Sequence, residues 1–162
     1  MKDQILRTLD PLIGEPLSGM FRFAGVQAFE FGVQRPARNR KGQEITHSDM
    51  GLHVACSWQV SGPEGFKLSS EDFDPDRGRR DEQAYPFYAL LESDPPLVEA
   101  IDADENGALR LRLSRGFALE VNPDTISCED ELIEDEDGEQ WRFLPKEEDK
   151  RHLVVTSRGI ET

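Results

Sequence analysis

The residues with the most obvious chemistry form an acidic run near the C-terminus of this 162-residue chain. Eight of the eleven positions from 129 to 139 carry a carboxylate, namely Glu129, Asp130, Glu131, Glu134, Asp135, Glu136, Asp137 and Glu139. Such a run can bind a cation or dock on a basic protein, and in its plainest form it is a solvated connection between strands. As a functional surface, it predicts binding of a basic protein partner.

Calcium loops need oxygen ligands at fixed positions, with a glycine at position six and a bidentate glutamate at position twelve. The acidic run lacks this spacing. Counting from Asp102, the segment DADENG places Asp104 at position three and Gly107 at position six. Position twelve is Leu113, which offers no oxygen, so we predict a hairpin turn at this segment. The sequence therefore indicates no metal site and no cofactor.

Histidine and cysteine give no catalytic pattern either. His53 and Cys56 are three positions apart on a predicted strand, so their side chains point to opposite faces and do not share an ion. Three acidic residues follow Cys128, and their charge disfavours the thiolate that a cysteine nucleophile requires. The chain also lacks a G-x-S-x-G motif and a phosphate-binding loop. We therefore predict no catalytic residues and a protein that is not an enzyme.

The formal net charge of −14 and the isoelectric point of about 4.6 restrict the classes of molecule that we expect to bind this protein. Nucleic acids and anionic membranes repel such a protein, so we expect neither of them to bind. No apolar run is long enough to span a membrane, and the N-terminal residues lack the pattern of a signal peptide. We expect a cytoplasmic protein with reduced cysteines and a single domain over residues 1–162.

The hydrophobic pattern predicts an α+β fold. Apolar residues at helical spacing indicate an N-terminal helix over 3–13, which Asp3 would cap. Strict alternation predicts one long strand over 50–60. A short helix over 86–93 would have Pro86 in its first turn. We expect the N-terminal helix to pack on a mainly antiparallel sheet of about six to eight strands.

One hairpin and four further strands also belong to this prediction. The loop 114–116 joins two alternating segments, so Leu113 should lie opposite Phe117, and Leu111 opposite Leu119. Further strands are predicted over 66–70, 97–101, 140–144 and 152–156.

Residues 20–33 also alternate, as two short strands or as one strand with a bulge, and the pattern places Phe21 on the same face as Phe29 and Phe31. The basic stretch 35–43 is expected to be an exposed loop. Its arginines would pair with nearby carboxylates, or would form an anion-binding patch with Arg77–Arg80.

Segments along nearly the whole chain resemble a group of small bacterial proteins of unknown function. The most specific parts are the strand that contains Trp58, the segment FALEVNPD over 117–124, and the strands that contain Trp141 and His152. The acidic insert at 126–139 is longer here than in that group. The resemblance implies no activity, cofactor or catalytic residue. By size and charge, the chain is also similar to the compact acidic immunity proteins that bacteria encode beside secreted toxins.

Three functions are compatible with these features. The first is a non-enzymatic binding protein of the immunity type, whose acidic surface occupies the cationic cleft of a partner. The second is a small-molecule-binding or enzymatic domain with a pocket between helix and sheet, lined by His53, Trp58, Tyr85, Tyr88 and His152. The third is an accessory domain that dimerises through a sheet edge formed by residues 152–156. We favour the first, and the sequence leaves a monomer and a homodimer open.

Overall fold

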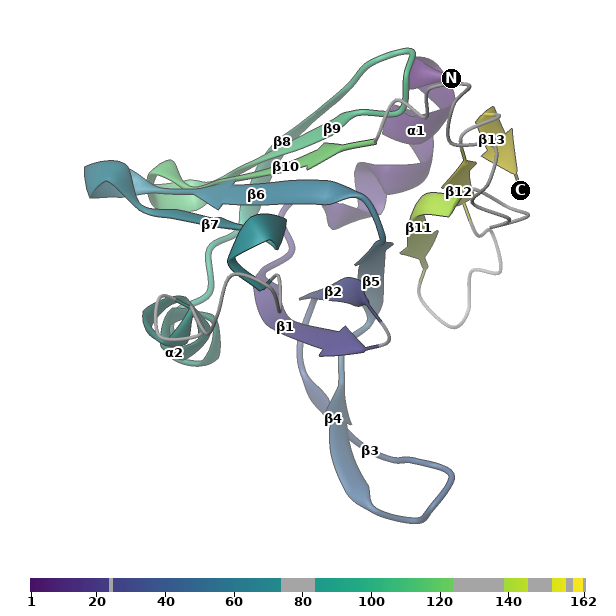
Figure 1. Ribbon diagram of the computed structural model, residues 1–162. Helices are drawn as coiled ribbons and strands as arrows, with labels where there is room; N and C mark the ends of the chain where they lie inside the picture. The colour runs from purple at the N-terminus through teal and green to yellow at the C-terminus, as the bar shows by residue number, and fades with distance from the viewer. Residues whose placement is uncertain (24, 74–83, 124–138, 146–152, 157–158, 162) are drawn as a thin grey trace.

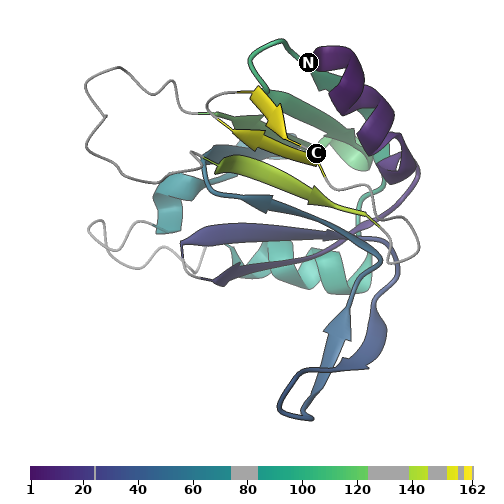
Figure 2. The ribbon, with the colours of Figure 1, turned by 90° about the vertical axis from the view of Figure 1, so that its right-hand side faces the viewer.

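The described residues fold into two antiparallel sheets, two α-helices and one projecting hairpin (Figures 1 and 2). The computed structural model describes residues 1–23, 25–73, 84–123, 139–145, 153–156 and 159–161. The predicted α+β class, N-terminal helix and antiparallel pairing are confirmed. The strands divide between sheets of six and of five strands, so the prediction of a single sheet is wrong.

The two sheets draw their strands from different parts of the chain. The six-stranded sheet has the order β1 (Leu17–Phe23), β2 (Val26–Phe31), β5 (Met50–Val54), β11 (Glu139–Leu144), β12 (Leu153–Thr156) and β13 (Gly159–Glu161). The five-stranded sheet has the order β7 (Lys67–Ser69), β6 (Ser57–Ser61), β10 (Ala118–Asn122), β9 (Leu109–Leu113) and β8 (Val98–Ala103). Every neighbouring pair is antiparallel.

The predicted single strand over 50–60 is wrong, because this segment contributes to both sheets. It forms β5 up to Val54 and β6 from Ser57. Between them, the amides of Ala55 and Cys56 both donate to the carbonyl oxygen of Gln140, at 2.8 and 3.2 Å. Two amides on one acceptor interrupt the regular ladder, as in a bulge. The apolar alternation continues through the break because both strands present the same series of side chains to one core.

The core is one apolar cluster to which both sheets and both helices contribute. The rings of Phe29 and Trp58 are nearly perpendicular, with their centroids 5.1 Å apart, and this contact joins the six-stranded to the five-stranded sheet. Helix α1 (Lys2–Leu9) packs against β8 and buries Ile5 and Leu9. The predicted cap is wrong, since Asp3 lies in the first helical turn, after the N-cap residue Met1.

Helix α2 (Tyr85–Ser93) confirms the second predicted helix, including Pro86 in its first turn. It packs against β1 and buries Phe87 and Leu91. The ring of Phe87 lies 5.5 Å from that of Phe66 and 5.7 Å from that of Phe117, measured between centroids. This aromatic group fixes α2 against the loops of the five-stranded sheet.

The predicted register of the glycine hairpin is confirmed. Leu111 lies opposite Leu119, and the amide of Leu113 donates to the carbonyl oxygen of Phe117 at 2.8 Å. The loop requires positive φ at two residues, Arg115 (61°) and Gly116 (84°).

The face of the six-stranded sheet that was predicted for Phe21 is wrong. Phe23 pairs with Val26, so Phe21 lies opposite Ala28, on the face away from Phe29.

The basic stretch after β2 is a hairpin, where the sequence analysis predicted a loop. Strands β3 (Arg35–Arg38) and β4 (Glu44–His47) pair with each other only, and Figures 1 and 2 show them projecting from the body of the molecule. We call residues 35–47 the arm. The side-chain oxygen of Asn39 accepts hydrogen bonds from the amides of Lys41 (2.9 Å) and Gln43 (3.0 Å), which closes its turn.

The predicted edge strand 152–156 is not at an edge. Strand β12 lies between β11 and β13, so its main chain is paired on both sides and offers no edge for dimerisation. None of the described helices is long and apolar enough to cross a membrane.

Candidate binding cleft

Only one of the eight residues proposed for partner binding lies among the described residues. Glu139 opens β11, where its carboxylate accepts two hydrogen bonds from the guanidinium of Arg142, at 2.8 and 3.1 Å. This carboxylate is therefore already engaged within the sheet. The other seven, Glu129, Asp130, Glu131, Glu134, Asp135, Glu136 and Asp137, lie outside the described residues, as do Cys128, His152 and Arg77–Arg80.

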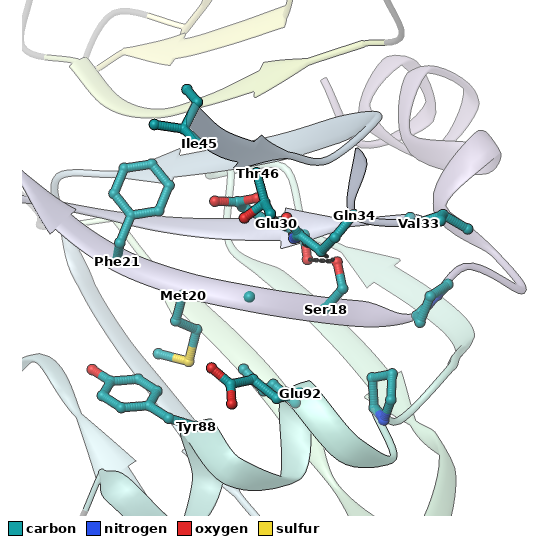
Figure 3. Close-up of a pocket in the computed structure, with 15 residues that line it drawn as sticks. Ser18, Met20, Phe21, Glu30, Val33, Gln34, Ile45, Thr46, Tyr88 and Glu92 are labelled. Carbon is teal, nitrogen blue, oxygen red and sulfur yellow. Dashed lines mark hydrogen bonds between the residues drawn. The ribbon is translucent and has the colours of Figure 1, made fainter. Parts of the chain in front are cut away.

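A hollow in the described part of the protein runs along strand β1. Its volume is about 1000 Å³, and it lies between the base of the arm and helix α2 (Figure 3). Figure 3 shows Phe21, Glu30 and Gln34 on the side of β1 that faces the arm, and Met20, Tyr88 and Glu92 on the side that faces α2. We call this hollow the β1 cleft. Glu139, the described member of the predicted partner-binding set, does not line it.

A small hydrogen-bond network positions Glu30 in the arm side of the cleft. The side-chain amide of Gln34 donates to the carboxylate of Glu30 at 2.9 Å and to the hydroxyl of Ser18 at 3.1 Å. Gly19 leaves room for this amide, since a Cβ there would lie 3.2 Å from the nitrogen of Gln34. The pairing of β1 with β2 is irregular between Leu17 and Gly19, which turns Ser18 toward the network.

The two carboxylates of the cleft are not balanced by a cation of the described residues. Glu30 and Glu92 form no ion pair within the described residues, and no lysine or arginine is among the lining residues. The amide of Gln34 is neutral, so its hydrogen bonds orient the Glu30 carboxylate without cancelling the charge. Each side of β1 therefore has one carboxylate directed at the cleft.

Apolar side chains accompany each carboxylate. On the arm side, Phe21 is 44% exposed and Ile45 is 42% exposed. On the α2 side, Met20 and Tyr88 are partly buried against the core. Side chains of this size left in contact with water are characteristic of surfaces that bind another molecule.

A second hollow of about 230 Å³ continues the cleft over the outer face of the six-stranded sheet. It shares Phe21, Glu30 and Ile45 with the cleft and extends to His53. Burial lowers the pKa of His53, and the nearby guanidinium of Arg142 lowers it further, while Glu139 and Glu30 oppose these effects. The imidazole is therefore a neutral hydrogen-bonding group at neutral pH.

Of the five side chains expected to line an enzymatic pocket, the four that the structure describes do not converge. Trp58 is buried in the core against Phe29, whereas His53 lies on the outer face of the sheet. Tyr85 is 62% exposed and only Tyr88 lines the cleft. Every buried side-chain nitrogen and oxygen of the described residues has a hydrogen-bond partner.

The acidic turn between β8 and β9 is a hairpin connection, as predicted. The carboxylate of Asp104 accepts hydrogen bonds from the amides of Asn106 (2.8 Å) and Ala108 (3.0 Å), so it serves the main chain. Among the residues that the structure describes, no group of three or more histidine, cysteine, aspartate and glutamate side chains is arranged to hold a metal ion.

Comparison with known proteins found no matching family model, no matching curated protein and no matching solved structure. The resemblance to small bacterial proteins of unknown function, and the weaker one to immunity proteins, therefore stay predictions.

Proposed function

We propose that this chain is a non-enzymatic binding protein of the immunity type, which engages a basic protein partner through its acidic surface. The observation that carries the proposal is the segregation of charge between the arm and the body. The arm contains four of the 19 basic residues and one of the 33 acidic residues. The remainder of the chain has 32 acidic against 15 basic residues, a formal charge of −17.

Ion pairs occupy three arginines of the body, each with one of the body's own carboxylates, and leave its net negative charge unchanged. Arg110 pairs with Glu120 at 3.1 Å, and Arg142 pairs with Glu139 at 2.8 Å. Arg115 pairs with Asp94 at 2.6 Å. These cations are held by the protein's own carboxylates, so the excess carboxylates dominate the field that an approaching molecule meets. A field of one sign accelerates association with a partner of opposite charge and makes it dependent on salt.

The arrangement of polar groups in the described core supports binding rather than catalysis. Its side chains are mainly apolar, and the four buried polar residues are Gln27, Ser48, Gln140 and Thr156. None of these is an acid, a base or an activated nucleophile of the usual kinds. A filled interior with its polar groups satisfied gives a rigid scaffold that presents a surface.

The proposal is tested by capture of partners from a lysate of the source organism, with tagged protein at low and at moderate salt. The informative variant neutralises Glu134, Asp135, Glu136 and Asp137 to the corresponding amides. The matched control neutralises Asp10, Glu64, Glu99 and Asp102, which are exposed elsewhere on the body and give the same net charge. We expect one basic protein that salt releases and that the informative variant captures less well than the control.

Two results would overturn the proposal. Capture of nothing at either salt concentration would exclude a stable protein partner in those cells. A partner that is not basic, and whose binding is insensitive to salt, would show that the acidic surface does not drive association.

A further inference from the structure

We infer that the β1 cleft is the docking site for an extended segment of the basic partner, in which cationic and apolar side chains both occur. This inference rests on the proposed function and adds the place where the partner would dock. The described residues that line the cleft lie outside the acidic run. Three properties of the cleft define the segment that fits it.

The first property is charge. Glu30 and Glu92 face the cleft from opposite sides of β1, and the described residues that line it include no lysine or arginine. Gln34 holds the Glu30 carboxylate in place with a 2.9 Å hydrogen bond, so its orientation is set before a ligand arrives. A lysine or arginine side chain in the cleft would therefore meet a carboxylate that is already oriented, so binding would cost little conformational entropy of Glu30.

The second property is the apolar surface beside each carboxylate. Phe21 and Ile45 form one apolar wall, and Met20 and Tyr88 form the other. Lysine and arginine carry long hydrocarbon stems, which pack on such walls while the charged group reaches the carboxylate. Leucine, valine or aromatic neighbours in the same segment would bury more of this surface.

The third property is shape. The cleft follows β1 from Pro16 to Phe21, which at the rise of a strand is roughly 15 Å. It is lined on both sides of the strand along this length. An extended segment sends successive side chains to opposite sides, so one series would meet the arm side and the other would meet the α2 side. A helix would present a single face and would fill only one side.

The test uses two short fluorescein-labelled peptides, one that alternates lysine with leucine and one with glutamate in place of lysine. Fluorescence anisotropy measures their affinity, and amide chemical shifts of labelled protein locate the site. The charge variant is Glu30→Gln with Glu92→Gln, and its control with the same net charge is Glu99→Gln with Asp102→Asn. The apolar variant is Ile45→Ala, and its control is Leu97→Ala, whose side chain is similarly exposed (46%) outside the cleft.

We expect the lysine peptide alone to bind, with shift changes centred on Glu30, Gln34 and Ile45. The charge variant should weaken binding about five- to tenfold and its control should do so by less than about twofold. Equal losses in the charge variant and its control would mean general attraction to an acidic surface, which overturns the cleft and leaves the proposed function standing. Failure of the wild type to bind the lysine peptide would also overturn the cleft, while lysate capture would still decide the function.

Discussion

The indole nitrogen of Trp141 donates a 2.8 Å hydrogen bond to the carbonyl oxygen of Gly107, 34 residues earlier in the chain. Trp141 belongs to the six-stranded sheet, and Gly107 belongs to the turn between β8 and β9 of the five-stranded sheet. Both residues are buried. The turn therefore sits directly on the other sheet, and this bond is one of the contacts that join the two sheets.

Two substitutions test this junction. Trp141→Phe should lower the free energy of unfolding by about 1–3 kcal/mol, because it leaves the Gly107 carbonyl unpaired and a small cavity. Gly107→Ala should lower it at least as much, because φ is +88° and an added Cβ would lie 2.6 Å from Cγ1 of the buried Val155. Urea denaturation measures both values.

Gly14 provides the matched control, since it has the same φ of +88° and no atom within 4 Å of an added Cβ. Gly14→Ala should lower the free energy of unfolding by about 1–2 kcal/mol, for the backbone conformation alone. Equal effects of the two alanines would contradict a close approach of the turn to Val155.

The sequence predicts those parts of the fold that depend on neighbours in the chain. The register of Leu111 and Leu119 follows from the loop at 114–116, whose length and glycine determine the pairing on both sides. The place of α2 follows from Pro86 and the spacing of its apolar residues. In both segments the local pattern and the tertiary environment favour the same structure.

Three features depend on distant contacts and were not predictable in this way. Alternation over 50–60 is the same whether the strand continues or changes sheet, so the break at Ala55 has no sign in the pattern. The arm contains Pro36 and four basic residues, which obscure its strand pattern. The β1 cleft is built from β1, β2, β4 and α2, and Glu30 becomes a site residue only when these elements meet.

A comparison of Phe87 with Tyr85 tests whether α2 is held by its aromatic contacts. Phe87→Ala should lower the free energy of unfolding by about 3–5 kcal/mol, because the ring is buried and contacts Phe66 and Phe117. Tyr85→Ala, two residues earlier in the same helix, should change it by less than about 1 kcal/mol, because the ring is mostly exposed. Thermal unfolding compares the two variants. Equal melting temperatures would contradict the conclusion that the aromatic contacts of Phe87 hold α2.

The lowered pKa of His53 predicts that the stability of the folded protein depends on pH. Its pKa is lowered from 6.5 in the folded protein, chiefly by burial and then by Arg142. Between the folded-state value and 6.5, the unfolded chain therefore binds more protons than the folded protein, and stability rises with pH. The stability that neutral His53 contributes to the folded protein is fully present above pH 6.5. It is lost as the pH falls from 6.5 through the folded-state pKa.

His53→Gln removes this contribution and retains a polar side chain of similar size. The free energy of unfolding of wild type should exceed that of the variant by a larger margin at neutral pH than at mildly acidic pH. Urea titrations of both proteins across this pH range measure the difference in free energy of unfolding. All other titratable groups are the same in both proteins, so their contributions cancel in this difference. Parallel pH profiles would refute a lowered pKa for His53 in the folded state.

Removal of the arm should leave the free energy of unfolding of the protein nearly unchanged. No side chain described between residues 35 and 46 is buried, so the arm adds little to the core, and an isolated two-stranded hairpin is marginal in water. Replacing residues 37–45 by Asn-Gly, between the paired residues Pro36 and Thr46, should change the free energy of unfolding by less than about 1 kcal/mol. The same change removes Ile45, so binding of the lysine peptide should fall at least as far as in Ile45→Ala.

Asn39→Ala distinguishes loss of arm structure from loss of arm residues. It removes the side-chain oxygen that accepts from the amides of Lys41 and Gln43, so amide exchange should accelerate in the arm and stay unchanged in both sheets. If Asn39→Ala weakens peptide binding while Ile45 is intact, the ordered hairpin positions the apolar wall. If truncation of the arm destabilises the whole protein by several kcal/mol, the arm belongs to the cooperative core, and the cleft has to be tested with point substitutions alone.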